Sequence, residues 1–137
     1  MKHHTKDKGD TGVGYVIADL LSKGIQVCIP ISEHLPFDLI AVKKAGEVYK
    51  ISVKYRKEAR GVIQIPFKSS YSDSKGVHSK KVNKTLIDVM AIYCPDSNKV
   101  YYINPKEFGE TVTLRRTKPK NNQKKVYLAE NYLNFPY

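Results

Sequence analysis

A carboxylate, a hydroxyl and an amine occupy positions that one hairpin can bring together. Asp38 begins one apolar segment, and Ser52 and Lys54 lie near the end of the next. If residues 44–46 form a three-residue hairpin loop ending in glycine, Asp38 stands directly opposite Ser52. Directly paired residues share a face of a sheet, and Lys54, two positions further along, shares it too. A two-residue loop instead places Asp38 and Lys54 on opposite faces.

This group of side chains has two chemical interpretations. As an ordinary cross-strand ion pair, Asp38 and Lys54 contribute about 0.2–1 kcal/mol, and the spacing alone favours this interpretation. As a nuclease site, the Asp38 carboxylate and the Val53 carbonyl bind Mg²⁺, or another divalent cation, beside the scissile phosphate. Lys54 then orients the attacking water or stabilises the charge that develops on the phosphate.

The net charge predicts a polyanionic partner. The 137 residues include 24 Lys and Arg against 13 Asp and Glu, which gives a formal charge of +11. Self-repulsion at this density disfavours the compact state unless an anion offsets it, and nucleic acid is the foremost candidate. An anionic membrane surface is disfavoured because the basic residues do not follow an amphipathic helix.

The length predicts a single domain over residues 1–137. No apolar stretch approaches the roughly 18 residues of a membrane span, and the N-terminus lacks a signal-peptide pattern. We therefore expect a cytoplasmic protein with no membrane partner. Cys28 and Cys94 are too few for a disulfide framework, and both lie in apolar runs, so we expect both to be buried. The motifs of serine hydrolases and of glycine-rich phosphate loops are absent from the sequence.

Hydrophobic periodicity predicts one helix followed by strands. Residues 7–23 place apolar side chains at helical spacing, and Gly24 supplies the stop. Residues 68–85 are polar and basic without sustained periodicity, which predicts a long loop. The other predicted elements are a buried strand at 25–29, a hairpin of 37–43 and 47–55, strands at 61–67, 87–94, 99–103 and 111–114, and a closing helix at 126–133.

Two basic segments are the predicted nucleic-acid contacts, with a solvated basic surface as the alternative for each. Lys and Arg bind phosphates, and Asn, Gln and Arg also read base edges. Gln64 is a candidate for reading the major groove from strand 61–67. Arg56, Lys57 and Arg60 follow the hairpin closely enough to meet phosphates near a cut. The first segment contributes Lys75, His78, Lys80, Lys81 and Lys84, and the second contributes Arg115, Arg116, Lys118, Lys120, Asn121, Asn122 and Gln123.

Short motifs over most of the chain are similar to those of one known family. They are KGDTG at residues 8–12, FDLI at 37–40, ISVK at 51–54, and the segments 87–95, 100–103 and 118–125. In these the sequence resembles the PD-(D/E)-x-K nuclease superfamily, and within it the small endonucleases encoded in group I introns. The resemblance implies an α/β, restriction-endonuclease-like fold with a mixed β-sheet core flanked by helices and with basic DNA-contacting loops. It also implies Mg²⁺-dependent cutting of double-stranded DNA by a homodimer or homotetramer.

Two positions depart from the family pattern. Val13 stands where the family has a glutamate in the first helix, and Ser52 stands where it has an acid or a glutamine. A serine hydroxyl is a poorer ligand for a hard cation than a carboxylate. Asp38 is then the only carboxylate on the metal, unless Asp10 or Glu33 approaches it.

Three functions follow from these observations. The leading prediction is a site-specific double-stranded DNA endonuclease of the homing type, with Asp38, Ser52 and Lys54 as catalytic residues and Asp38 and Val53 as metal ligands. The second is a catalytically impaired or engineered DNA-binding relative, which the residues Val13 and Ser52 motivate. The third, a small basic RNA-binding protein, rests only on charge and size.

Overall fold

Five strands form a mixed central sheet in the order β1-β2-β3-β7-β8. The computed structural model describes residues 4–117 and 126–137. Strands β3 and β7 pair in parallel, and the other neighbouring pairs are antiparallel. The strands are β1 (Gln26–Cys28), β2 (Leu39–Val42), β3 (Val48–Tyr55), β7 (Val89–Cys94) and β8 (Lys99–Ile103).

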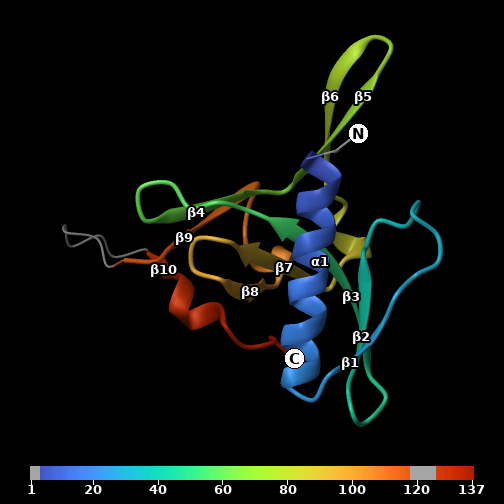
Figure 1. Cartoon of the computed structure of the whole chain (residues 1–137), viewed down its shortest axis with the longest axis vertical. Coiled ribbons are helices and arrows are strands. Elements are labelled where there is room, and N and C mark those ends of the chain that lie inside the picture. The colour runs from blue at the N-terminus through green and yellow to red at the C-terminus, as the bar shows by residue number, and fades with distance from the viewer. Residues whose placement is uncertain (1–3, 118–125) are drawn as a thin grey trace.

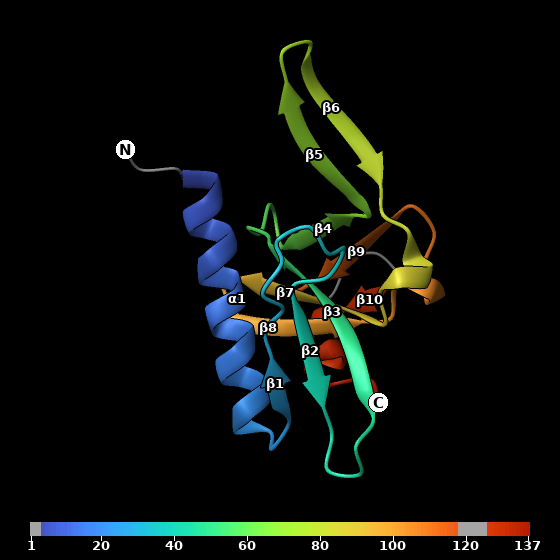
Figure 2. The same ribbon diagram turned by 90° about the vertical axis from the view of Figure 1, so that its right-hand side faces the viewer.

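Helix α1 (His4–Ser22) covers one face of this sheet (Figure 2). Its buried Val16 and Leu20 pack in a cluster with side chains of β2, β3, β7 and β8. The helix ends where the sequence predicts, because Gly24 adopts a positive φ of 76°. The amides of Gly24 and Ile25 then donate back to Leu21 and Leu20, each at 3.0 Å, in a Schellman arrangement. The helix begins at His4, earlier than the predicted residue 7.

A three-stranded sheet in the order β10-β9-β4 covers the opposite face. Ile63 and Leu114 from this sheet pack with Met90 and Ile92 of β7 in a second buried cluster. Strand β7 is therefore buried on both faces, which explains its continuous apolar sequence. The predicted mixed α/β fold is confirmed. The covering strands are β4 (Val62–Pro66), β9 (Thr111–Arg115) and β10 (Tyr127–Leu128).

The hairpin of β2 and β3 has the register that the three-residue loop predicts. Leu39 pairs with Ile51 and Val42 with Val48. Gly46 ends the loop with a φ of 95°, a left-handed conformation that glycine adopts without strain. Asp38 lies just before this paired segment, and its amide donates to the carbonyl of Ile51, the partner of Leu39, so the regular register ends before the predicted pairing of Asp38 with Ser52.

The prediction of a long loop at residues 68–85 was wrong. Strands β5 (Lys68–Asp73) and β6 (Gly76–Lys81) pair antiparallel in a two-stranded ribbon, which the short 3₁₀ helix η1 (Lys84–Leu86) follows. Figures 1 and 2 show this ribbon projecting beyond the rest of the protein. Because the ribbon packs on no core, its strands carry none of the apolar alternation that reveals a half-buried strand in sequence.

The predictions of a buried strand with a buried Cys28 and of a closing helix at 126–133 were also wrong. Strand β1 is an edge strand rather than a buried one, and Cys28 on it is exposed, whereas Cys94 is buried as predicted. Residues 126–133 form β10 and the 3₁₀ helix η3 (Ala129–Tyr132) instead of an α-helix, because β10 adds in parallel to β9. A further 3₁₀ helix, η2 (Pro105–Glu107), follows β8.

No helix within residues 4–117 and 126–137 has both the length and the apolar character needed to cross a membrane.

Candidate active site

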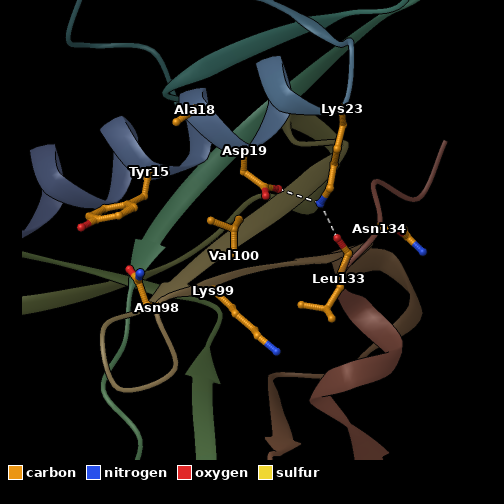
Figure 3. A pocket seen from close by; sticks show the side chains of 9 residues that line it. All are labelled: Tyr15, Ala18, Asp19, Lys23, Asn98, Lys99, Val100, Leu133 and Asn134. Carbon is orange, nitrogen blue, oxygen red and sulfur yellow. Dashed lines mark hydrogen bonds and ion pairs between the residues drawn. The ribbon is translucent and has the colours of Figure 1, made fainter.

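One surface cavity, of about 470 Å³, lies between α1, the β7–β8 turn and the C-terminal segment (Figure 3). Two of its charged side chains, Asp19 and Lys23, bond to each other. The Asp19 carboxylate accepts hydrogen bonds from Lys23, at 2.7 Å, and from the Tyr102 hydroxyl, and Lys23 also donates to the carbonyl of Leu133. This network fastens the helix to the sheet and to the C-terminal segment, so its role is structural.

A second cavity of about 470 Å³, called the cleft below, lies where the open end of the β2–β3 hairpin meets the base of the ribbon. The cleft brings Asp38, Ser52, Val53 and Lys54 together, as the sequence predicts. Its other walls come from residues 34–36 and from segments around the ribbon. These lining residues include Ser69, Lys80, Lys81, Asn83 and Leu86.

The Asp38 carboxylate lies against the backbone of β3. Its Oδ2 accepts a hydrogen bond from the Val53 amide at 2.7 Å, and the Asp38 amide donates to the Ile51 carbonyl at 2.8 Å. Strand β2 begins only at Leu39, so the carboxylate takes the place of a strand partner for Val53. Among the described residues, Oδ1 of Asp38 has no hydrogen-bond partner, which leaves this oxygen available to a cation.

The Val53 carbonyl points to the same edge of β3. The amide and the carbonyl of one strand residue project to the same side, and the Val53 amide faces Asp38. The even-numbered residues of β3 face β7 instead, as the bond from the Asp88 amide to the Lys50 carbonyl illustrates. The Val53 carbonyl therefore lies beside Asp38 on an edge that β2 does not cover.

Lys54 shares a sheet face with Ser52, and both residues line the cleft with Asp38. Ser52 pairs with Met90 and Lys54 with Ile92, and these two partners belong to the apolar cluster on the face opposite α1. Burial lowers the pKa of Lys54, Asp38 opposes this shift and Arg56 adds to it. No salt bridge joins Lys54 to Asp38 within the described parts of the chain. The ordinary ion pair, one of the two interpretations of the sequence, is therefore not formed.

Val13 and Ser52 occupy the two family positions that lack an acid, and no neighbouring carboxylate of the described residues compensates for them in the cleft. Ser52 lines the cleft and is only 7% exposed. Val13 packs against the apolar cluster beneath α1, and Asp10 and Glu33 are exposed and do not line the cleft. In residues 4–117 and 126–137 no group of three His, Cys, Asp or Glu side chains is placed to hold a metal.

The donor atoms that are present still fit one divalent cation. A carboxylate oxygen of Asp38 and the carbonyl oxygen of Val53 meet at an open strand edge, and both are hard ligands. Mg²⁺ commonly binds through one or two carboxylates, with water and phosphate oxygens completing its shell. The geometry therefore favours a cation that binds together with a phosphate rather than a site that holds metal alone.

The predicted basic contacts fall into different settings. Lys80 and Lys81 line the cleft, and Lys75 and His78 lie further along the ribbon. Lys81 forms an ion pair with Glu110 at 3.0 Å. The exposed Lys57, Arg60 and Gln64 lie on or before β4, and Arg115 is half-buried on β9; Lys118, Lys120, Asn121, Asn122 and Gln123 lie outside the described residues.

Three more of the predicted contacts bond within the protein. Lys84 donates to the carbonyls of Phe108 and Gly109 at 2.6 and 2.5 Å, and its ammonium lies 4.6 Å from the centre of the Phe67 ring. Arg116 forms an ion pair with Glu58. Arg56 donates from Nε to the Gln64 carbonyl at 2.8 Å, which ties β3 to β4.

Two residues, one in the site and one that supports it, were not identified from the sequence. Ser69 lines the cleft beside Lys80, because the two residues pair across β5 and β6. Asp88 supports β3, since its Oδ2 accepts a hydrogen bond from the Lys50 amide at 2.8 Å. Both positions depend on pairings between strands, β5 with β6 and β3 with β7, that were not predicted from the sequence.

Comparisons with known proteins give a family match and a similar fold. A family model described as PD-(D/E)XK endonuclease matches residues 3–135. The fold is similar to that of a bacterial homing endonuclease, I-Ssp6803I, with a TM-score of 0.72 and 20% sequence identity over 93% of this chain and 87% of that one. A likeness at this identity shows the fold alone. A comparison with curated protein sequences gives no match.

Proposed function

Since the chain belongs to the PD-(D/E)XK endonuclease family, we propose that it is a site-specific endonuclease of the homing type, which hydrolyses phosphodiester bonds in double-stranded DNA with Mg²⁺. One observation carries the proposal: the Asp38 carboxylate, the Val53 carbonyl and the Lys54 ammonium meet in a single cleft. The carboxylate and the ammonium are not joined in a salt bridge in the described residues, so both are available to a substrate.

The charges around the cleft favour a phosphate. Its lining includes three lysines, Lys54, Lys80 and Lys81, against one carboxylate, Asp38. A cleft lined mainly by positive side chains has a positive electrostatic potential, which attracts anions such as phosphate. The net charge of +11 extends this attraction over the rest of a polyanion.

In hydrolysis, a water oxygen bonds to phosphorus, one ester P–O bond breaks, and the leaving oxygen takes up a proton. Asp38, held in place by the Val53 amide, and the Val53 carbonyl would hold the cation. When bound, the cation polarises the phosphoryl oxygens and activates water. The Lys54 ammonium donates to the phosphate as negative charge develops on it, and the partly buried setting of Lys54 strengthens this interaction.

Cutting both strands of a duplex requires a second site, because one small site hydrolyses one strand. A symmetric homodimer or homotetramer supplies paired sites related by a two-fold axis, which matches the symmetry of the two antiparallel DNA strands. We therefore propose that the protein assembles as a homo-oligomer on DNA.

Selection from a randomised duplex library tests the proposed function. The protein is incubated with the library in Mg²⁺, cut ends are captured and sequenced, and a recovered duplex is cut again in a plasmid. We expect one recurrent target, conversion of the plasmid to linear product, and loss of cutting in EDTA. Recovery of no recurrent target in either Mg²⁺ or Mn²⁺ would contradict the proposal.

A catalytically impaired DNA-binding relative is the second candidate, and Ser52 favours it. Its hydroxyl lies on the same sheet face as Lys54 and supplies no charge to a cation. This protein would yield no cut ends, but a recurrent target would be recovered from the same library by isolating protein-bound duplexes.

Replacing Ser52 with glutamate is expected to lower the Mg²⁺ concentration for half-maximal cleavage by about an order of magnitude, because a second carboxylate joins Asp38 in the cleft. If the parent protein binds without cutting, the same variant should start to cut. Ser69→Glu is the matched control, since it adds the same charge to the opposite wall of the cleft. Equal effects of the two variants would attribute the change to net charge and not to a metal ligand.

A further inference from the structure

The ribbon of β5 and β6 has two faces with different surroundings. Side chains alternate between the faces of a two-stranded ribbon, and directly paired residues share one face. Ser69 pairs with Lys80, and Lys68 pairs with Lys81. The first face therefore carries Ser69, Lys80 and His78, and the second carries Lys68, Lys81 and Val77.

The first face continues the wall of the cleft. Ser69 and Lys80 both line the cleft with Asp38 and Lys54. The base of the ribbon also touches the catalytic lysine, because Nζ of Lys54 lies 3.4 Å from the carbonyl oxygen of Lys68. A duplex whose phosphate enters the cleft thus meets the first face as it continues along the ribbon.

The cations on the two faces differ in their partners. Lys81, on the second face, is ion-paired to Glu110, and the two residues line a separate hollow with Lys68. No acidic side chain of the described residues forms a salt bridge with Lys80. On the first face, Nε2 of His78 lies 2.9 Å from Oδ1 of Asp73, and this contact orients the imidazole ring.

The dimensions of the ribbon suit the major groove of DNA. Each strand has six residues, which corresponds to a length of about 20 Å. The ribbon projects from the body of the protein with no second layer packed on it (Figures 1 and 2). The major groove admits a two-stranded ribbon and displays a different pattern of donors and acceptors for each base pair.

We propose that the ribbon enters the major groove beside the cut with its first face toward the duplex. Lys80 then binds a phosphate close to the scissile one, and His78 lies over base edges further along the groove. The second face points away from the DNA beyond the base of the ribbon, where Lys81 also lines the cleft. This assignment rests on the proposed function for the position of the scissile phosphate. It predicts that Lys80 contributes to the affinity for DNA and that His78 contributes to the sequence specificity.

The phosphate contact is tested by the salt dependence of binding to a short mixed-sequence duplex in EDTA. Lys80→Gln should reduce the slope of log K against log salt by about 0.9, the value for one lost phosphate contact. Lys68→Gln is the matched control, because it removes the same charge from the second face of the same ribbon. We expect its slope to change by less than half as much. An equal or larger loss in Lys68→Gln would overturn the orientation.

The base contact is tested by repeating the library selection with two neighbouring variants. His78→Ala should relax the preference for one base pair in each half-site by about tenfold. Val77→Ala, which alters the exposed second face, should leave the selected sequence unchanged. A relaxed preference in Val77→Ala, or none in His78→Ala, would contradict the proposal.

These experiments separate the two proposals. The salt-dependence measurement needs no cleavage, so a parent protein that never cuts rejects the proposed function while the comparison of Lys80 with Lys68 still decides the orientation of the ribbon. A parent protein that cuts, with equal slope losses in both variants, rejects the orientation alone.

Discussion

Asp38→Asn is expected to reduce single-turnover DNA cleavage by at least about a thousandfold, while affinity for the target changes little. A bound cation contributes several kcal/mol to the stabilisation of the transition state, and Asp38 is the only carboxylate that lines the cleft in the described residues. Asparagine keeps the size of the side chain and an oxygen that accepts the Val53 amide, but it loses the negative charge. Cleavage is measured in Mg²⁺, and affinity is measured in EDTA.

Asp88→Asn provides a close control for this experiment. Asp88 also accepts a hydrogen bond from a β3 amide, that of Lys50, at 2.8 Å, but it does not line the cleft. Its replacement should therefore leave cleavage within a few-fold of the parent value. Comparable losses in the two variants would show that support of the β3 backbone, and not metal binding, explains the effect of Asp38.

Lys54→Met is the second substitution with a large expected effect, a loss of about 10²- to 10³-fold in the rate of cleavage. Methionine has a similar length but cannot donate to the phosphate. Lys50→Met is the control, since Lys50 lies on the same face of β3 but outside the cleft. Both proteins should bind DNA, and only the first should fail to cut it. Cutting by Lys54→Met at the parent rate would remove Lys54 from the mechanism.

The pH profile of cleavage distinguishes two roles of Lys54. Burial lowers its pKa from the ordinary value of 10.5. If the protonated ammonium stabilises the phosphate, cleavage falls as the pH rises through this lowered pKa, and Lys54→Arg, which stays protonated, shows no such fall. This is the outcome we expect. A rate that increases over the same range would instead indicate a neutral amine that accepts the proton of the attacking water.

The departures at Val13 and Ser52 have different structural consequences. Ser52 lines the cleft, so its replacement directly alters the donor set beside Asp38. Val13 packs with the apolar side chains beneath α1, and a carboxylate at this position would leave that cluster to reach a metal. The two positions are therefore not equivalent routes to a stronger metal site, and the Mg²⁺ dependence of Ser52→Glu is the more direct test.

The residues of the site were largely predictable from local sequence. A glycine at residue 46 specifies the three-residue loop, and the loop specifies the register of Leu39 with Ile51, which brings Asp38 to the end of β3 that carries Ser52. The alternation of side chains then puts Lys54 on the same face as Ser52. Each of these steps depends on neighbours along one hairpin, so the sequence contains all the information needed.

The tertiary structure decided what surrounds these residues. The sequence of residues 68–81 lacks apolar alternation, so no periodic pattern revealed the ribbon, and the pairing of Ser69 with Lys80 appears only when its two strands meet. Cys28 lies in an apolar run like that of Cys94, but it is exposed because β1 is at the edge of the sheet, whereas β7 is covered on both faces. Local sequence patterns determine which residues pair within the β2–β3 hairpin. Packing against segments that are distant in the sequence determines which residues are buried and which ones complete the cleft.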